Sequence, residues 1–266
     1  MATKPKPATS QPLKATPPEA KTSVAVRKPT NGSVVSIKDQ IAAQVAAMGD
    51  RIAPPGGNKI KLAAGSFTLT DGTKTPGPVD LVIVDFVARN MFYEGDYDKD
   101  NIVPPVCFAI GSNPLKLVPS PNSPLPQAKS CAECPMNQFG SKGKGKACKN
   151  ERSLAVLQPD ADADTPLSVL NVSPTGIRGF DGHVAGIVRT FQNVPASVIT
   201  TVSLDPNQSY PALLFSDPQP NPNFADHFAR QGEAQAMLAV EPDVSSYGVE
   251  KPPPAKAAPK RPAVRR

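Results

Sequence analysis

The sequence predicts a mainly β or α+β protein whose body is built around a β-barrel. Proline accounts for 33 of the 266 residues, and tryptophan is absent. Proline interrupts helix interiors and central strands, so its frequency favours short strands joined by ordered loops over long helices. Strand-like segments follow one another with only a few helical segments between them. This order argues against the regular strand and helix alternation of a parallel α/β sheet.

Some segments carry apolar residues at helical spacing, and others have the composition of β-strands. Within residues 81–88 only Asp85 interrupts the apolar side chains, which is typical of a mostly buried central strand. Ser36 and Ser173 are candidate N-caps for the first two helices. The expected helices are 36–52, 174–190 and 224–240. The expected strands are 59–63, 66–70, 79–88, 106–110, 153–157, 167–172, 198–204 and 212–215.

Charge and composition divide the chain into a body and two basic, proline-rich tails. Residues 1–31 and 250–266 each contain six lysines and arginines against one glutamate. Without large apolar side chains, neither tail can bury enough surface to offset its ordering entropy, so both are expected to be disordered. The whole chain has 29 basic and 23 acidic residues. The body, residues 32–249, is therefore slightly acidic, and the net positive charge comes from the tails.

All four cysteines lie close together in the sequence with the spacing C-x23-C-x2-C-x13-C, as Cys107, Cys131, Cys134 and Cys148. A C-x2-C pair directs two thiolates at one point, and two further cysteines can complete a tetrahedron around Zn²⁺ at about 2.3 Å per bond. We therefore expect a structural zinc subdomain with four cysteine ligands, inserted at about residues 107–150. Because protein sulfur would fill all four positions, no site is left for an activated water, and an architectural role is expected.

Other uses of the cysteines remain open. Two disulfides would require an oxidising compartment, yet residues 1–31 contain no apolar stretch like that of a signal peptide. An iron–sulfur cluster also uses four cysteines, although the spacing differs from ferredoxin ligand runs. Cys107 lies in the apolar run 106–110 and could be ordinary strand core. In that case His183 or His227 could supply the fourth ligand.

The segment between Cys134 and Cys148 contains lysines that alternate with glycine. Glycine lets the backbone approach a phosphate closely, while alternate ammonium groups contact it. Since the rest of the body is acidic, this cluster concentrates positive potential on one face. A solvated loop with no ligand is the simpler alternative, but fixation at both ends by cysteines favours a binding role. The expected phosphate contacts are Lys142, Lys144, Lys146, Lys149 and Arg152.

Aromatic side chains are the second component of a surface for single-stranded nucleic acid, because each stacked base contributes about 1–3 kcal/mol. Arg89, Phe92 and Tyr93 lie at and just after the central strand, and Phe139 lies between the C-x2-C pair and the lysines. We expect these four residues to contact nucleic acid. Further candidates are Tyr97 and Tyr210, whereas core positions are expected for Phe86, Phe108, Phe180 and Phe215.

Signatures of several enzyme classes are missing, so the protein is not expected to be an enzyme. The sequence contains no GxxxxGK[ST], HExxH or GxSxG motif and no His-x-Glu of a zinc deaminase. The acidic segment 160–164 lacks the glycine and glutamate that complete an EF-hand loop, so a solvated hairpin tip is expected. No run of 18 apolar residues occurs, and no membrane span is expected.

Several stretches of the sequence resemble proteins encoded by tailed bacteriophages. They are Phe-Tyr-Glu-Gly at 92–95, Pro-Pro-Val-Cys-Phe-Ala-Ile-Gly at 104–111, Cys-Ala-Glu-Cys-Pro-Met-Asn-Gln-Phe-Gly-Ser at 131–141 and Gly-Lys-Gly-Lys-Ala-Cys-Lys at 143–149. The architecture is also similar to that of phage single-stranded DNA-binding replication proteins, in which a zinc subdomain interrupts an OB-type barrel. Those proteins use three cysteines and one histidine and end in acidic tails, whereas this chain has four cysteines and a basic C-terminal tail.

The resemblance implies an OB-like barrel with a zinc insert in residues 32–249, and sequence-independent binding of single-stranded DNA in phage DNA replication or recombination. It also implies replisome or polymerase proteins as partners, and the cytoplasm of the infected bacterial host as the location. Two alternative functions stay open. One is a zinc-stabilised protein-interaction or transcription-modulating protein, and the other is an iron–sulfur nuclease accessory.

Overall fold

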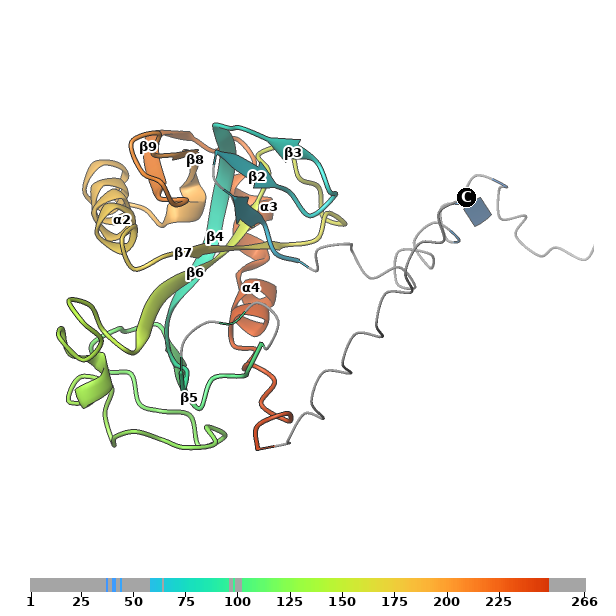
Figure 1. Ribbon diagram of the computed structural model, residues 1–266. Helices are drawn as coiled ribbons and strands as arrows, with labels where there is room; N and C mark the ends of the chain where they lie inside the picture. Colours follow the sequence, from blue (N-terminus) through green and yellow to red (C-terminus); the bar gives the residue numbers. More distant parts are fainter. Residues whose placement is uncertain are drawn as a thin grey trace, which may run out of the picture. The chain divides into compact units, whose positions relative to one another are not determined.

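The computed structural model describes residues 58–248 except 64, 96, 97 and 99–101, together with positions 37, 40, 41 and 44 (Figure 1). The chain forms two units, Met1–Arg51 and Ile52–Arg266. In the first unit the four described positions are helical, which agrees with the helix expected at 36–52. The rest of that helix and both predicted basic tails lie outside the described residues.

The second unit is organised by one long strand, β4 (Val79–Phe92), in a six-stranded antiparallel sheet (Figure 1). The other strands are β5 (Cys107–Gly111), β6 (Lys149–Leu157), β7 (Ser168–Val172), β8 (Val198–Leu204) and β9 (Leu213–Pro220). One edge of β4 pairs with β6 over most of its length. The other edge has two partners in turn, because β8 pairs with its first residues and β5 with its last. β7 extends the sheet beyond β6, and β9 extends it beyond β8.

A smaller antiparallel sheet precedes β4 and consists of β1 (Lys61–Ala63), β2 (Ser66–Thr68) and β3 (Lys74–Thr75). The turn between β2 and β3 contains Asp71 and Gly72. The backbone N–H of Thr73 donates to Oδ1 of Asp71 at 2.7 Å, and Gly72 has a φ of +88°. This left-handed conformation is one that glycine adopts without steric cost.

Both faces of the large sheet are covered by apolar side chains, since successive residues of a strand point to opposite faces. On one face, Phe180 of α2 (Ile177–Phe191) joins a core that includes Leu154 of β6 and Phe67 of β2. The Phe180 ring centroid lies 5.0 Å from that of Phe86 and 5.2 Å from that of Phe215, both edge to face. On the opposite face, α4 (Gln231–Leu238) packs against alternate residues of β4 and β6.

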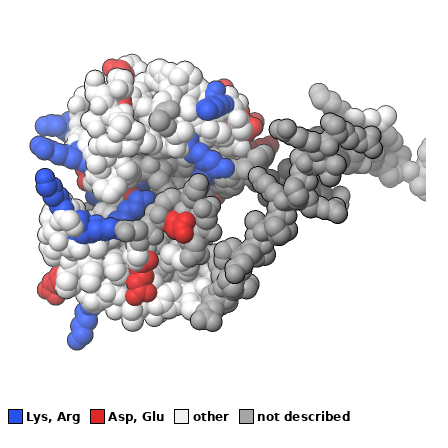
Figure 2. All heavy atoms as spheres, viewed as in Figure 1, with Lys and Arg blue, Asp and Glu red and all other residues white. Residues whose placement is uncertain are grey.

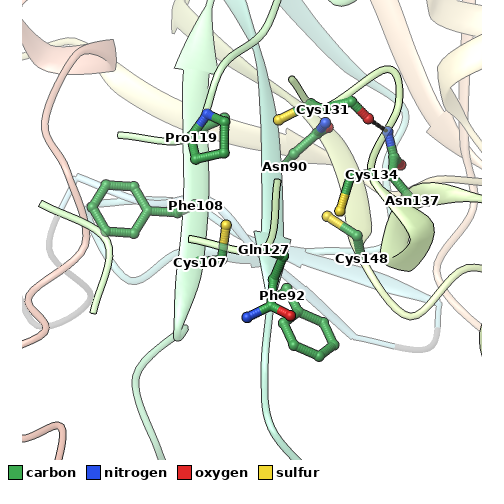
Figure 3. Close-up of a pocket in the computed structure, with 11 residues that line it drawn as sticks. Asn90, Phe92, Cys107, Phe108, Pro119, Gln127, Cys131, Cys134, Asn137 and Cys148 are labelled. Atoms are coloured by element: carbon green, nitrogen blue, oxygen red, sulfur yellow. Dashed lines mark hydrogen bonds between the residues drawn. The ribbon is translucent and has the colours of Figure 1, made fainter. Parts of the chain in front are cut away.

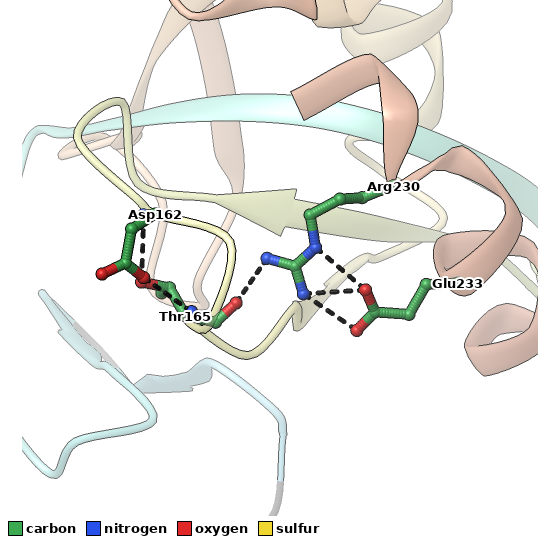
Figure 4. Close-up of polar contacts among 4 residues, drawn as sticks. All are labelled: Asp162, Thr165, Arg230 and Glu233. Atoms are coloured by element: carbon green, nitrogen blue, oxygen red, sulfur yellow. Dashed lines mark hydrogen bonds and ion pairs between the residues drawn. The ribbon is translucent and has the colours of Figure 1, made fainter. Parts of the chain in front are cut away.

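The helix expected at 224–240 is in fact two helices, α3 (Phe224–Ala229) and α4, with Arg230 between them. The Arg230 guanidinium forms a salt bridge with Glu233 at 2.8 Å and donates to the carbonyl oxygen of Thr165 (Figure 4). Thr165 belongs to the turn between β6 and β7, where its backbone N–H and Oγ1 donate to Asp162. The side chain of Asp162 is exposed, so the predicted solvated hairpin tip is confirmed.

All the predicted strands have counterparts, but three of them are longer than expected, and β9 continues past residue 215 to Pro220. β4 continues past residue 88 to Phe92, and β6 begins at Lys149 instead of residue 153. The added residues include Asn90, Asn150 and Glu151, so the apolar pattern ends before the hydrogen-bonded ladder does. The expected cap Ser173 is wrong. The N-cap residue of α2 is Gly176, and no side chain caps the helix.

The predicted OB-like barrel is not what the described strands form. In the strand order β7-β6-β4-β8-β9, the edge strands β7 and β9 do not pair, so the sheet is open in this part of the chain. The α+β class is confirmed, but barrel closure is not. One edge of β4 is shared by β8 and β5. Helices α2 and α4 cover the two faces. None of the described helices is long and apolar enough to cross a membrane.

Replacing Phe180 with alanine is expected to lower the free energy of unfolding by about 3–5 kcal/mol, because the ring is fully buried between aromatic neighbours. Urea unfolding followed by circular dichroism measures this change. Phe139→Ala is the matched control, because that ring is 81% exposed and its loss should change stability by less than about 0.5 kcal/mol. Equal losses in the two variants would contradict the assignment of Phe180 to the core.

Candidate functional site

β5 and the irregular segment that follows it form a lobe beside the last residues of β4, and the four cysteines belong to this part of the chain (Figure 1). We call β5 together with the irregular segment 112–148 the cysteine lobe. Cys107 lies on β5, while the other three are positioned by backbone hydrogen bonds. Cys131 donates its N–H to the carbonyl oxygen of Leu117 at 3.0 Å, and Cys148 donates to that of Met136 at 2.7 Å. A short 3-10 helix, η1 (Pro135–Asn137), directly follows Cys134.

All four cysteines line one cavity of about 10 Å³ (Figure 3). Each is buried, with 6–8% of its surface exposed, and none forms a disulfide. Figure 3 shows the side chains of Cys134 and Cys148 directed toward the space that Cys107 and Cys131 flank. A cavity of this size has room for about one water molecule or one small ion. The tertiary structure thus brings together all four residues that the sequence proposed as ligands.

Electrostatics around the cysteines oppose the thiolate form in the absence of a cation. Burial raises the pKa of Cys148 to about 12, the other three cysteines add to the rise, and Lys146 opposes it. Burial also raises the pKa of Cys131, although a hydrogen bond with Asn90 acts to lower it. Since thiolates in one buried cavity repel one another, the protonated form is favoured.

The atoms of this cluster are of the kind that bind a metal ion, but they do not lie at metal-binding distances from one point. Four enclosed cysteine sulfurs are the donor set that structural zinc sites use. However, no three His, Cys, Asp or Glu side chains among the described residues are arranged to hold a metal ion as they stand. The sulfurs would have to move inward, to about 2.3 Å from an ion. The irregular segment that carries Cys131 and Cys134 is free of the sheet pairing that fixes Cys107.

Cys107 is a buried strand residue and also lines the cavity that the other three cysteines line. Neither histidine lines the cavity. His227 is buried in α3, where its Nδ1 lies 3.1 Å from Nδ2 of Asn221. His183 lies on α2, with Nε2 3.1 Å from Oγ1 of Thr200. A histidine ligand in place of Cys107 is therefore not supported.

Three asparagines connect the sheet to the cysteine lobe, and no pattern in the sequence indicated them. Asn150 of β6 donates through Nδ2 to Oδ1 of Asn90 at 2.6 Å and to Oδ1 of Asn137 at 2.9 Å. Asn137 in turn donates to the carbonyl oxygen of Cys131 at 2.7 Å. The pairing of Asn90 with Asn150 across β4 and β6 sets up this chain. Asparagine has no characteristic spacing when its partners are distant in sequence, so only the fold could reveal the network.

The lysine loop, residues 139–149, is a tight turn held by its own backbone. Gly140 donates its N–H to the carbonyl oxygen of Gly145 at 2.9 Å, and Gly145 donates to that of Lys142 at 3.0 Å. Gly140 and Gly143 have φ values of +90° and +58°. A residue with a Cβ rarely adopts such values, so Gly140 and Gly143 are needed for this turn.

The side chains of the lysine loop differ in their surroundings. Lys142 and Lys144 are exposed, whereas Lys146 is half-buried. The Lys146 Nζ lies 5.1 Å from the centre of the Phe139 ring, which is a cation–π distance. The same ammonium lies 3.4 Å from Oδ1 of Asn137. Lys146 is thus held in place by the lobe.

A hollow of about 540 Å³ lies between the lysine loop and the segment after β4, and we call it the loop hollow. Its volume is in the range of small-ligand sites. The lining combines cations with an aromatic ring, namely Lys142, Lys146, Lys149 and Tyr93. Glu94 and Asp98 also line it. Figure 2 shows basic side chains gathered on this face over the lysine loop and α2.

Arg152, which the sequence placed among the phosphate contacts, has another role. Its side chain is buried, and Nε and Nη2 donate to the carboxylate of Asp181 at 3.2 and 2.9 Å. This two-point salt bridge joins β6 to α2. Because the guanidinium is already neutralised and largely out of solvent, we do not retain Arg152 as a phosphate contact.

Two of the other proposed contacts, Arg89 and Phe92, are engaged within the fold, whereas Lys149 and three described aromatic residues are exposed. Arg89 is partly buried and donates through Nη2 to the carbonyl oxygen of Val240 at 3.0 Å. Phe92 lines the cysteine cavity and so supports the lobe. Lys149 pairs with Glu151 at 3.0 Å but keeps 53% of its side chain exposed. Tyr93, Phe139 and Tyr210 are exposed, although Tyr210 does not line the loop hollow, and Tyr97 lies outside the described residues.

Comparison with protein-family models, curated proteins and solved structures finds no significant match for this chain. A functional conclusion therefore depends on the residues and the geometry described above. The features that bear on it are the cysteine cluster, the lysine loop and the loop hollow.

Replacing Asn137 with alanine is expected to loosen the cysteine lobe, because Cys131, Asn150 and Lys146 each lose a polar partner. Leaving buried groups unpaired costs about 1–3 kcal/mol for each group. Hydrogen exchange measured by mass spectrometry should show faster exchange in residues 130–150 and unchanged exchange in β8. Asn113→Ala is the control, because Asn113 accepts only from its own exposed loop. Unchanged exchange near Cys131 would contradict a supporting role for Asn137.

Proposed function

We propose that the protein binds single-stranded DNA without sequence preference and that the loop hollow is where the strand binds. The observation that carries this proposal is the lining of the hollow, in which three lysines surround one tyrosine. Lysines contact the phosphates of any sequence, and an aromatic face stacks with any base. Phe139, at 81% exposure, offers a second stacking surface on the same loop.

The charges in the loop hollow suggest how a strand would lie. Glu94 and Asp98 repel phosphates, so the sugar–phosphate backbone would follow the lysine loop, and the bases would turn toward Tyr93. Lys146 is the best-placed cation because its position beside Phe139 and Asn137 is already fixed. A fixed ammonium loses little side-chain entropy when it binds a phosphate.

We further propose that Cys107, Cys131, Cys134 and Cys148 hold one structural Zn²⁺. A divalent cation would offset the repulsion among four thiolates, and its binding free energy would contribute to folding of the lobe. Cys134 precedes the lysine loop and Cys148 is part of it. An ion in the cluster would therefore fix both ends of the loop that we propose contacts DNA.

The resemblance of the cysteine and glycine–lysine motifs to proteins of tailed bacteriophages supports a biological setting for this activity. We propose a role in phage DNA replication or recombination in the cytoplasm of the infected host, with replisome or polymerase proteins as partners. The basic tails, residues 1–31 and 250–266, would add phosphate contacts that carry no sequence information.

Replacing the three loop lysines together, Lys142→Glu, Lys144→Glu and Lys146→Glu, is expected to weaken binding to oligo-dT by at least about tenfold. Each phosphate contact that is lost should also lower the salt dependence of binding by about one unit of slope. Fluorescence anisotropy titrations at several salt concentrations measure both quantities, with a duplex as the comparison ligand.

The matched control carries Lys61→Glu, Lys74→Glu and Lys116→Glu, three exposed lysines outside the loop hollow. It makes the same change in net charge. Equal losses in the two triple variants, or equal affinity of the unchanged protein for oligo-dT and duplex, would contradict a specific single-strand site. Retention of a polymerase or replisome subunit on the protein, without any DNA affinity, would favour the protein-interaction alternative.

The purified protein is expected to contain about one zinc ion per chain by mass spectrometry of its metals, and Cys134→Ser should lower this content. Chelation should speed hydrogen exchange in the lysine loop and leave the exchange of β4 and β8 unchanged. A brown protein with absorbance in the visible would instead indicate an iron–sulfur cluster. Absence of any bound metal, together with no uptake of added Zn²⁺, would overturn the metal proposal.

A further inference from the structure

A second hollow, of about 510 Å³, shares Tyr93 and Lys149 with the loop hollow. Its other lining residues lie on β4, β6, β7 and the end of α4, in the segment 240–242 that follows α4, and at 58–59 before β1. We call it the sheet hollow. Because two residues border both hollows, a strand bound in the loop hollow passes directly beside the sheet hollow. Its volume is again in the range of a small-ligand site.

The sheet hollow is distinguished by a buried carboxylate. Glu151 is only 4% exposed. One of its carboxylate oxygens, Oε2, lies 3.0 Å from Nζ of Lys149 and forms an ion pair with it. No ion pair between described residues involves the other carboxylate oxygen, Oε1. A carboxylate withdrawn from water is costly unless N–H donors satisfy it, so this site favours a ligand that brings donors.

Two donor groups accompany the carboxylate. The Nε of Arg89 is buried and has no hydrogen-bond partner among the described residues, while Nη2 of the same guanidinium is held by Val240. Asn171 accepts at Oδ1 from Ser153 at 2.9 Å, which leaves its amide nitrogen as a donor. The hollow therefore presents an acceptor at Glu151 and a donor at Asn171, while Nε of Arg89 has almost no exposed surface.

The walls between these polar groups are apolar and aromatic. Met91, Met237 and Val169 line the hollow together with the ring of Tyr93. Thioether and aromatic surfaces pack well on flat rings. Lys59 and Glu241 also line the hollow. A phosphate placed beside the buried carboxylate of Glu151 would be repelled. The lining thus suits a flat, neutral ring with polar edges, which is the description of a nucleobase.

We propose that the sheet hollow takes one guanine base of the bound strand, with the Glu151 carboxylate accepting from its N1–H and N2–H groups. Guanine is the base with two adjacent donors on one edge, which matches the two oxygens of a carboxylate. Its O6 and N7 acceptors suit a donor such as the Asn171 amide. The proposal rests on the single-strand binding proposed above, and it adds a preference at one position to binding that is otherwise indifferent to sequence.

The test compares 15-nucleotide oligo-dT with the same oligonucleotide carrying one central substitution, by competition against labelled oligo-dT. A single dG is expected to raise affinity by at least about fivefold, the lower end for a two-point contact with a base edge. A single dA or dC should give no such gain. Deoxyinosine, which lacks the N2 amine, should give a smaller gain than dG because only one donor then faces the carboxylate.

Glu151→Gln removes the acceptor pair and is expected to abolish the dG advantage. Affinity for oligo-dT should hold or rise slightly, because Lys149 then loses its acidic partner. Asp80→Asn is the matched control, an exposed acid on the first part of β4, and should keep the dG advantage. Circular dichroism confirms folding, and Asn171→Ala provides a second variant if Glu151→Gln fails to fold.

The possible outcomes separate this inference from the proposed function. Equal affinity for the dT, dG, dA and dC oligonucleotides would overturn the guanine site and leave single-strand binding intact. A dG advantage that survives both Glu151→Gln and Asn171→Ala would also overturn it. No affinity for any oligonucleotide would refute the proposed function, and the guanine site with it.

Discussion

The structure depends on the pairing of one strand, β4, with three others. One edge is bound by β6 along most of the strand, and the opposite edge is shared by β8 and β5. The first half of β4 lies in the main apolar core, and its last residues carry the cysteine lobe. A single hydrogen-bonded ladder therefore connects the stability of the core to the position of the site.

The cysteine lobe has little apolar core of its own, and polar interactions compensate for this. Ala88, Ala109, Leu117 and Cys131 form its small buried cluster. Backbone hydrogen bonds and the three asparagines position the remaining segment. Glu241, beyond α4, accepts from Ser120 at 2.6 Å and from Asn122 at 2.7 Å, which ties the lobe to the chain after the last helix. A metal ion in the cysteine cluster would supply the stabilisation that apolar burial does not.

The residues expected to contact nucleic acid illustrate what sequence patterns can reveal. Lys142, Lys146, Lys149 and Tyr93 meet at one hollow, because the register of β4 and β6 brings the lysine loop beside the end of β4. Arg152 belongs to the same basic run, but Asp181 lies far away in sequence and neutralises it. Local patterns report the residues of a loop well. They carry no information on which of those residues a distant carboxylate will bind.

The sequence alone determined most of the succession of strands and helices, but not β3 or the division between α3 and α4. It also determined the basic tails as a compositional feature and the grouping of four cysteines with alternating lysines. These features are local, since apolar spacing and residue composition act over a few neighbouring positions. Only the tertiary structure decided that the sheet is open, that Cys107 joins the other cysteines and that Glu151, Arg89 and Asn171 line one hollow. Those outcomes depend on strand register and on contacts between residues far apart in the chain, which no short stretch of sequence encodes.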